Sequence, residues 1–317
     1  METKNNNTSC GFKTSIGGQA LIEGIMMRGP QKQSIVCRTE EGLVEKVEDL
    51  KFIKDKYPIL GLPLIRGIFT FFDSMIKGVQ ALSYSAELIP IDEQEEPDRI
   101  DQFIENHFSS EKAEKLIIGV AVLLGVLLSV VLFVVLPTFL AGLLKNIHFN
   151  LVIRNLFEGL FRIIIFLIYM YLFSHMKDMK RLFSYHGAEH KTIFCYEHEK
   201  ELTVDNVREE SRFHPRCGTS FLFVVIIISI LVNSIVTATN SFARMGLHIL
   251  LIPVVVGISY EINRWCGRHD NIVSKILSAP GKWLQRLTTN EPDDGMIECA
   301  IRAIELVIPE KKGTDLW

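Results

Sequence analysis

The sequence predicts an α-helical polytopic membrane protein with a small β-rich part at its N-terminus. One observation leads to this fold class, and two further observations exclude other classes of protein or segment. The apolar side chains of the 317 residues gather into runs near or above the length that crosses a bilayer. The net charge of −3 is too small to indicate nucleic-acid binding. The first residues, 1–14, are polar and rich in asparagine, so no secretory signal is expected there.

The N-terminal region, residues 1–57, is predicted to be a β-rich cytoplasmic unit. Residues 34–39 and 43–50 have the composition of two strands, and the short acidic stretch with a glycine between them suits a hairpin. Residues 16–30 are apolar and punctuated by glycine, which indicates a further strand or turn system.

Residues 58–90 are predicted to hold an amphipathic helix that lies in the membrane interface or enters it as a re-entrant segment. The helix covers 64–84, where a narrow polar stripe at helical spacing interrupts an otherwise apolar surface. Ionisable groups are costly in the middle of a bilayer, so this helix is not expected to span alone. The stripe consists of Arg66, Thr70, Asp73, Lys77 and Tyr84. Residues 91–115 follow as an acidic, solvated linker.

Four apolar runs are predicted to cross the bilayer as helices. The first is uninterrupted apolar sequence that ends at Pro137, and the second carries Glu158 and Arg162 four residues apart near its start. The third contains serine and asparagine side chains suited to hydrogen bonds between helices, and the fourth is shorter and contains Pro253. The predicted spans are 116–136 and 156–175, within the region 116–175, and 219–239 and 245–262, within the region 219–262.

Basic residues are distributed unevenly between the loops, and this decides the predicted topology. The loops after the first and third spans hold few lysines and arginines, whereas the connector 176–218 and the C-terminal region 263–317 hold many. By the positive-inside rule these segments and both termini lie in the cytoplasm. The six cysteines then face a reducing compartment, which argues against a disulfide framework and leaves metal ligation open. The C-terminal region is expected to be helical, over 272–287 and again from 290–294 onward.

Within the connector 176–218, the sequence YHGAEHK carries the spacing H-x-x-E-H. On a helix, His186 and His190 project from one face and can hold one metal ion. Glu189 is then placed to help deprotonate an activated water, which makes it the candidate catalytic residue. The alternative is a polar helix on the membrane surface whose histidines bind lipid phosphate or nothing.

A third metal ligand is needed, because two imidazoles alone hold a divalent ion weakly. Glu261 is the first candidate, since a carboxylate at the end of a span needs a cation, although Arg264 competes for it. His214 and Cys217, in the sequence FHPRCGTS, are the alternatives, and the same residues also suit a tight turn before the third span. The expected cofactor is a divalent metal, with zinc as the first choice.

Five sequence motifs span nearly the whole chain: GGQALIEGIMMRG (17–29), YHGAEHKT (185–192), LTVDNV (202–207), RFHPRCGTSF (212–221) and LQRLTTNEP (284–292). In these motifs the chain resembles the YqhQ-like family of bacterial membrane proteins, which are catalogued as predicted metal-dependent enzymes. The resemblance implies a multi-pass location in the bacterial inner membrane. A second resemblance, to H-x-x-E-H metallopeptidases, covers only His186, Glu189 and His190. It implies that both histidines bind zinc, that the glutamate is the base, and that a downstream glutamate, here Glu261, completes the site.

Two functions are compatible with these observations. The first is a metal-dependent hydrolase at the cytoplasmic face of the membrane, which attacks an amide, ester or phosphoester with water. The second is a non-enzymatic membrane component that assists the assembly of a larger membrane complex, with its polar groups holding the cytoplasmic surface together. The expected partners are the lipid bilayer and other membrane proteins, and no nucleic acid.

Overall fold

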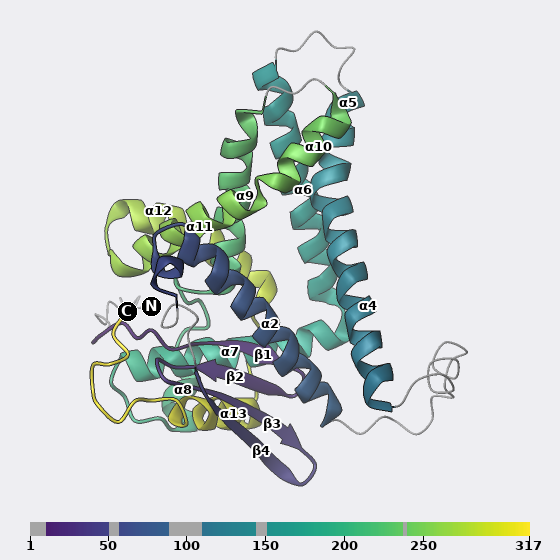
Figure 1. The fold of residues 1–317 in the computed structure, drawn as a ribbon. Coiled ribbons are helices and arrows are strands. Elements are labelled where there is room, and N and C mark those ends of the chain that lie inside the picture. The colour runs from purple at the N-terminus through teal and green to yellow at the C-terminus, as the bar shows by residue number, and fades with distance from the viewer. Residues whose placement is uncertain (1–10, 51–56, 89–109, 144–150, 237–239) are drawn as a thin grey trace, which may run out of the picture. The chain divides into compact units, whose positions relative to one another are not determined.

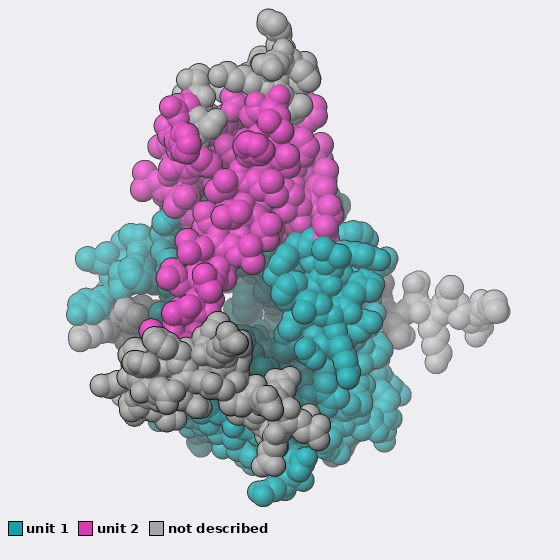
Figure 2. Space-filling view, turned by 90° about the vertical axis from the view of Figure 1, so that its right-hand side faces the viewer, with its two compact units in different colours: residues 1–88, 169–229, 253–317 teal, residues 89–168, 230–252 magenta. Residues whose placement is uncertain are grey.

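The computed structural model describes five stretches of the chain, namely 11–50, 57–88, 110–143, 151–236 and 240–317 (Figure 1). The chain divides into two compact units (Figure 2). Unit 1 consists of Met1–Leu88, Tyr169–Ser229 and Pro253–Trp317, and unit 2 consists of Ile89–Ile168 and Ile230–Ile252. The described residues are mostly helical, with one four-stranded sheet near the N-terminus, so this part of the predicted fold class is confirmed.

The sheet of unit 1 is an antiparallel meander in the order β1-β2-β3-β4. Pairing of Thr39 with Gly42 closes the turn between β3 and β4, and Gly42 has φ +128°, a conformation that favours glycine. The predicted hairpin is therefore present. The strands are β1 (Gly17–Leu21), β2 (Gly24–Arg28), β3 (Lys32–Thr39) and β4 (Gly42–Asp49).

Helices cover both faces of this sheet, because successive side chains of the central strands point to opposite sides. The first face packs against α7 (Lys177–Glu197) and α13 (Asp294–Glu305), and the second packs against α2 (Ile65–Glu87). The middle parts of β2 and β3, residues 25–27 and 35–37, are consequently apolar at consecutive positions rather than alternating with polar residues. The first face carries Ile25, Met27 and Val36, and the second carries Met26, Ile35 and Cys37.

Helix α2, which follows the short 3-10 turn η1 (Pro58–Gly61), is continuous and lies on the second face of the sheet (Figure 1). A Cβ atom on Gly78 would lie 2.4 Å from the side-chain oxygen of Gln19, so that side chain would have to shift if position 78 were not glycine. Within the polar stripe, Asp73 forms a 2.6 Å ion pair with Arg28 of β2. Several apolar side chains of α2 remain exposed: Phe69, Phe72, Met75, Ile76 and Leu82.

The remaining helices of unit 1 carry or flank the polar connector and the C-terminal region. Asn271 and Ser274 form a capping box at the start of α12, and the side chain of Asp293 caps α13. The two predicted C-terminal helices are therefore confirmed. The helices are α8 (Val204–Arg208), α9 (Gly218–Ser234, which continues into unit 2), α11 (Ile252–Arg268), α12 (Ile272–Thr288) and α13.

Unit 2 buries a cluster of charged side chains among apolar helices. Glu158 lies 3.4 Å from Arg162, as predicted, and also 2.8 Å from Arg244 and 3.2 Å from His248. Arg162 also donates a 2.9 Å hydrogen bond to the carbonyl of Phe133, which lies in a π-helical segment. The elements are α4 (Ser110–Val130), η2 (Val131–Val135), α5 (Leu136–Leu143), α6 (Leu151–His175) and α10 (Ser241–Leu250).

Two or three apolar helices among the described residues are long enough to cross a membrane. Leu116–Leu143 and Ile153–His175 qualify by themselves, and they coincide with the first two predicted spans. Phe242–Leu250 and Ile252–Arg268, at the fourth predicted span, form a pair bent by 42° that counts as one span at most. The third predicted span is the shorter apolar helix Gly218–Ser234, and residues 237–239 lie outside the described residues, as does most of the predicted linker 91–115.

Candidate metal centre

The H-x-x-E-H residues lie on α7, as the spacing predicts (Figure 1). Tyr185 and Ala188 of this helix are fully buried in the core shared with the sheet and α13, which fixes the rotation of α7 about its axis. His186 and His190 then project from the same side, and their ring centroids lie 4.3 Å apart.

Backbone carbonyl groups set the proton positions on both imidazoles. The Nδ1 atom of His186 lies 2.8 Å from the carbonyl oxygen of Thr288, and Nδ1 of His190 lies 2.6 Å from that of Arg212. A carbonyl oxygen can only accept, so each Nδ1 must donate. In the neutral ring this leaves the Nε2 lone pair free, which is how metal-ligating histidines are commonly oriented.

Cys217 is the third group at this position, directly before the first residue of α9. Its sulfur lies 3.2 Å from Nε2 of His186 and accepts a 3.5 Å hydrogen bond from the backbone N–H of Thr219. Among the described residues, the ligand atoms that come together are those of His186, His190 and Cys217, all within 4.8 Å of one another.

The electrostatics favour a thiolate at Cys217. Burial acts to raise the pKa of this thiol, but the neighbouring His190 and His186 outweigh burial and hold the pKa well below its usual value. Burial likewise acts to lower the pKa of His186, yet the nearby thiolate raises that pKa to about 9. A thiolate is the form of cysteine that binds metals and attacks electrophiles, so the pair is chemically competent for either role.

Glu189 lies beside the same cluster with one oxygen engaged. It accepts a 3.0 Å hydrogen bond from the backbone N–H of Gly18 in β1, while its Oε2 is buried and has no hydrogen-bond partner among the described residues. Burial raises the pKa of Glu189. A Cβ atom at position 18 would lie 2.5 Å from the carbonyl oxygen of Met26 and 3.1 Å from the carboxyl carbon of Glu189. Only glycine therefore allows β1 to approach this carboxylate so closely.

Glu261, the first candidate for the third ligand, is not part of this group. Arg66 of α2 holds it through both carboxylate oxygens, with a 2.7 Å bond to Oε1 and a second short contact to Oε2. The backbone N–H of Leu64 also donates to Oε1, at 3.3 Å. The expectation for Glu261 is corrected, because the cation that its carboxylate meets is an arginine of the amphipathic helix rather than a metal or Arg264.

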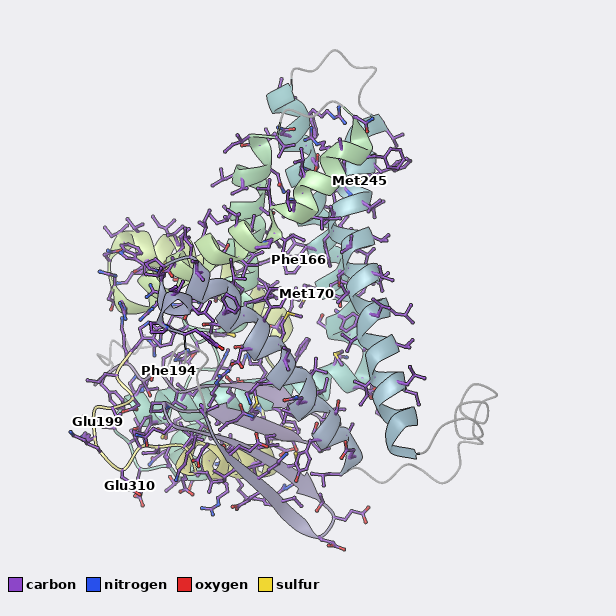
Figure 3. All side chains as sticks on the ribbon, viewed as in Figure 1. Phe166, Met170, Phe194, Glu199, Met245 and Glu310 are labelled. Atoms are coloured by element: carbon purple, nitrogen blue, oxygen red, sulfur yellow. The ribbon has the colours of Figure 1, made fainter. Side chains whose placement is uncertain are left out.

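His214, one of the two alternatives, belongs to a separate buried network. Its Nε2 lies 3.3 Å from a carboxylate oxygen of Glu197, and its Nδ1 accepts from the backbone N–H of Arg216 at 3.3 Å. Both ring nitrogens are thus engaged within the protein, and burial lowers the pKa of His214 to about 4. The ring also packs 4.4 Å from that of Phe194 of α7, which Figure 3 labels. The structure therefore favours Cys217 over His214 as a ligand.

Glu197, which the sequence analysis did not single out, is the centre of that network. It is fully buried and accepts from the backbone N–H of Thr14 at 2.8 Å, from His214, and from the guanidinium of Arg216 in a short contact. Burial acts to raise the pKa of Glu197, but these partners hold it below its usual value. The network fixes the N-terminal segment and the FHPRCG turn to the end of α7.

The donor set suits zinc. Two imidazole nitrogens and one thiolate give three protein ligands, the number that catalytic zinc sites use while leaving a coordination position open. The Nε2 atom of His190 is buried without a hydrogen-bond partner among the described residues, which is costly unless something binds it. A metal ion at this position would satisfy that nitrogen.

Three further residues shape the candidate metal centre without using a side chain, so side-chain chemistry could not have predicted them. The carbonyl groups of Thr288 and Arg212 act through the backbone, and Gly18 acts by lacking a side chain. Their place in the sequence could have pointed to them, because all three lie inside motifs that carry the family resemblance.

Comparisons with known proteins agree with that resemblance. The sequence profile of the family DUF1385, described as a protein of unknown function, matches residues 62–310. The chain is similar to the uncharacterized protein YqhQ of Bacillus subtilis (strain 168), with 36% identity over 294 residues that cover 90% of each chain. No solved structure gives a significant match. The chain therefore belongs to the DUF1385 family and to its YqhQ-like proteins.

Proposed function

We propose that the protein is a metal-dependent hydrolase that acts at the cytoplasmic face of the bacterial inner membrane. One observation carries the proposal. One ring nitrogen each of His186 and His190 and the sulfur of Cys217 converge within 4.8 Å, beside Glu189, which has a buried oxygen that lacks a hydrogen-bond partner among the described residues.

In this proposal His186, His190 and Cys217 hold the metal, with zinc as the first choice, and the carbonyl groups behind the two rings keep them oriented. A zinc ion with an open position supplies a Lewis acid and lowers the pKa of water toward neutrality. Glu189 accepts a proton through its unpartnered Oε2, while the N–H of Gly18 holds its other oxygen in place. Burial makes this carboxylate more basic than an exposed one, which suits a general base. The substrate class is an amide, ester or phosphoester.

The membrane location is supported by the apolar helices Leu116–Leu143 and Ile153–His175 and by the bent pair that follows them. We propose four spans, with α9 as the third. Its 17 residues rise roughly 25 Å, which is short of the ~30 Å hydrocarbon core, so this span would include neighbouring residues. The exposed apolar face of α2 suits a helix in the interface, as expected for residues 64–84.

Both termini are proposed to be cytoplasmic, on the charge distribution described above. Alkaline phosphatase, which is active only outside the cytoplasm, can be fused after Leu143 and, in a second chain, after His175. The first fusion should be active and the second inactive. The reverse pattern would refute this orientation.

Metal content is the decisive measurement for the enzyme proposal. The full chain, purified in detergent without chelator, should carry about one zinc per chain by elemental mass spectrometry. His190→Ala and Cys217→Ser should each lose most of it, because two remaining ligands hold a divalent ion weakly. Glu189→Gln should keep the metal and abolish hydrolysis, since this carboxylate is proposed as a base and not as a ligand.

Matched controls separate ligand loss from general damage. Glu261→Gln should keep the metal, because Arg66 and not the metal binds that carboxylate. Cys266→Ser should also keep it, because this thiol lies outside the cluster. If the wild-type chain carries no metal and gains no thermal stability from zinc or manganese, the hydrolase proposal fails. The protein would then be either a metal-free cysteine-dependent enzyme or a non-enzymatic membrane component of a larger complex.

A second candidate, a cysteine-dependent hydrolase, is favoured by the 3.2 Å contact between the Cys217 sulfur and His186. Such a pair activates a thiolate as a nucleophile without a metal. Alkylation by iodoacetamide distinguishes the two mechanisms. A zinc-bound Cys217 should be protected until a chelator is added, whereas a free nucleophile should react at once and be indifferent to chelator.

A further inference from the structure

Unit 1 contains a cavity of about 710 Å³ that is separate from the metal centre. Its volume lies within the ~300–1,000 Å³ range of small-molecule sites. The walls come from α9, α11 and α12, and buried Val224 lies among them, whereas Trp265 and Ile276 are exposed at the surface. Most of the lining is apolar and includes Phe223, Ile227, Ile228, Ile262, Leu277 and Pro280.

Positive charge gathers along one side of this cavity. Arg264 and Arg268 lie one helical turn apart on α11, and neither forms an ion pair or hydrogen bond with another described residue. Arg66 and Glu261 also line the cavity but neutralise each other. Three arginines against one glutamate leave an excess of two positive charges, without counting His269.

This combination is matched by an amphiphile that carries a phosphate. A small free anion would gain nothing from the apolar walls, and a purely apolar ligand would gain nothing from the two guanidinium groups. Arginine also pairs with phosphate oxygens in two parallel hydrogen bonds, which a lysine cannot do. The helix α12, which lines the cavity through Ile276, Leu277 and Pro280, also exposes apolar side chains within about one turn of them, namely Ile272, Val273 and Trp283, and these can receive an acyl chain that extends out of the cavity.

We propose that this cavity binds one anionic phospholipid, with an acyl chain against α9 and the phosphate against Arg264 and Arg268. The site is independent of the proposed hydrolase activity, because it shares no residue with the group formed by His186, His190 and Cys217. The lipid would be a resident or regulatory ligand of unit 1.

Native mass spectrometry of the full chain in detergent tests this directly. The probes are phosphatidylglycerol and phosphatidylcholine with identical acyl chains. Phosphatidylglycerol should saturate at one molecule per chain and at a concentration at least about tenfold lower than phosphatidylcholine requires. The double variant Arg264→Gln, Arg268→Gln should weaken phosphatidylglycerol binding roughly 10- to 30-fold, since each arginine contributes about 1 kcal/mol toward an anionic lipid. It should weaken phosphatidylcholine binding less, because the choline cation of that lipid opposes the charge of its phosphate.

Two further variants test whether the effect is specific to the arginines and to the cavity. Arg286→Gln removes an exposed arginine of α12 that lies outside the cavity, and it should leave binding unchanged. Ile228→Trp should narrow the cavity and weaken both lipids, with an unaltered melting temperature as evidence of folding. Equal affinity for the two lipids, or full displacement of phosphatidylglycerol by inorganic phosphate, would overturn the proposal. Zinc content should be the same in all these variants, so a failure here is distinct from a failure of the hydrolase proposal.

Discussion

Replacing Gly187 with alanine tests the packing that holds the metal centre together. Gly187 lies between His186 and Ala188 on α7, and a Cβ atom there would meet the carbonyl oxygen of Asn290 at 2.0 Å. Ordinary van der Waals contact begins near 3.4 Å, so the segment after α12 would have to move by at least 1.4 Å, the difference of these distances. Thr288, the last residue of α12 and two positions before Asn290, supplies the carbonyl that orients His186.

The expected cost follows from three contributions. Overpacking costs about 1–3 kcal/mol, and the displaced segment weakens the 2.8 Å hydrogen bond from the N–H of Asn290 to the carbonyl of Phe183, which is worth about 1 kcal/mol. Alanine in a helix is better than glycine by about 1 kcal/mol, which offsets part of this loss. We therefore expect Gly187→Ala to destabilise unit 1 by about 1–3 kcal/mol. Loss of the Thr288 contact should also weaken zinc binding by roughly 10- to 100-fold.

Thermal unfolding in detergent and zinc titration measure these two effects. The matched control is Gly246→Ala in α10, where a Cβ atom would meet nothing within 4 Å. This control should be neutral or stabilising by up to about 1 kcal/mol, because only helix propensity changes. If Gly187→Ala melts at or above the wild-type temperature, Asn290 does not approach α7 this closely. The carbonyl of Thr288 would then not hold His186 in the described orientation.

Three further predictions concern the structure around this site. Glu197→Gln should destabilise the protein by about 3–5 kcal/mol in chemical denaturation, because it leaves buried positive charge uncompensated, whereas exposed Glu199→Gln should have little effect. Asp73→Leu should cost about 1 kcal/mol by removing the 2.6 Å ion pair with Arg28, and an unchanged melting temperature would contradict that pairing. Burial lowers the pKa of His214 to about 4 from 6.5, so only the unfolded chain binds this proton between those values. Stability should therefore fall by about 1.4 kcal/mol per pH unit below pH 6.5, and the fall should be shallower in His214→Asn.

Local patterns predicted the individual elements well. The hairpin of β3 and β4 and the helices α12 and α13 follow from residue spacing and capping within a few residues. The helical face shared by His186 and His190 is equally local, since one turn of α7 brings them together. Local spacing alone therefore brings together two of the three side chains that converge at the candidate metal centre.

The choice among Glu261, His214 and Cys217 for the third position could not be made from the sequence, because it depends on contacts between distant segments. Arg66 is separated from Glu261 by 195 positions, and the spacing of the polar stripe does not indicate a partner elsewhere in the chain. Arg66 takes that carboxylate, and the turn before α9 instead brings Cys217 to His186. His214 is less suited to the third position for a similar reason, because its Nε2 lies 3.3 Å from a carboxylate oxygen of Glu197.

The positions of the family motifs bear on whether this centre is a working site or a structural device. Gly18 of the first motif contacts Glu189, the motif at 212–221 supplies a carbonyl group and Cys217, and the motif at 284–292 supplies the carbonyl of Thr288. All of these meet around α7. The motif at 202–207 instead ends in Val207, which packs in an apolar core. A purely structural cluster would be satisfied internally, but here the Nε2 of His190 and the Oε2 of Glu189 are buried without a hydrogen-bond partner among the described residues. Each such atom is costly in a folded protein, and a metal ion bound by His190 would remove the cost at that nitrogen.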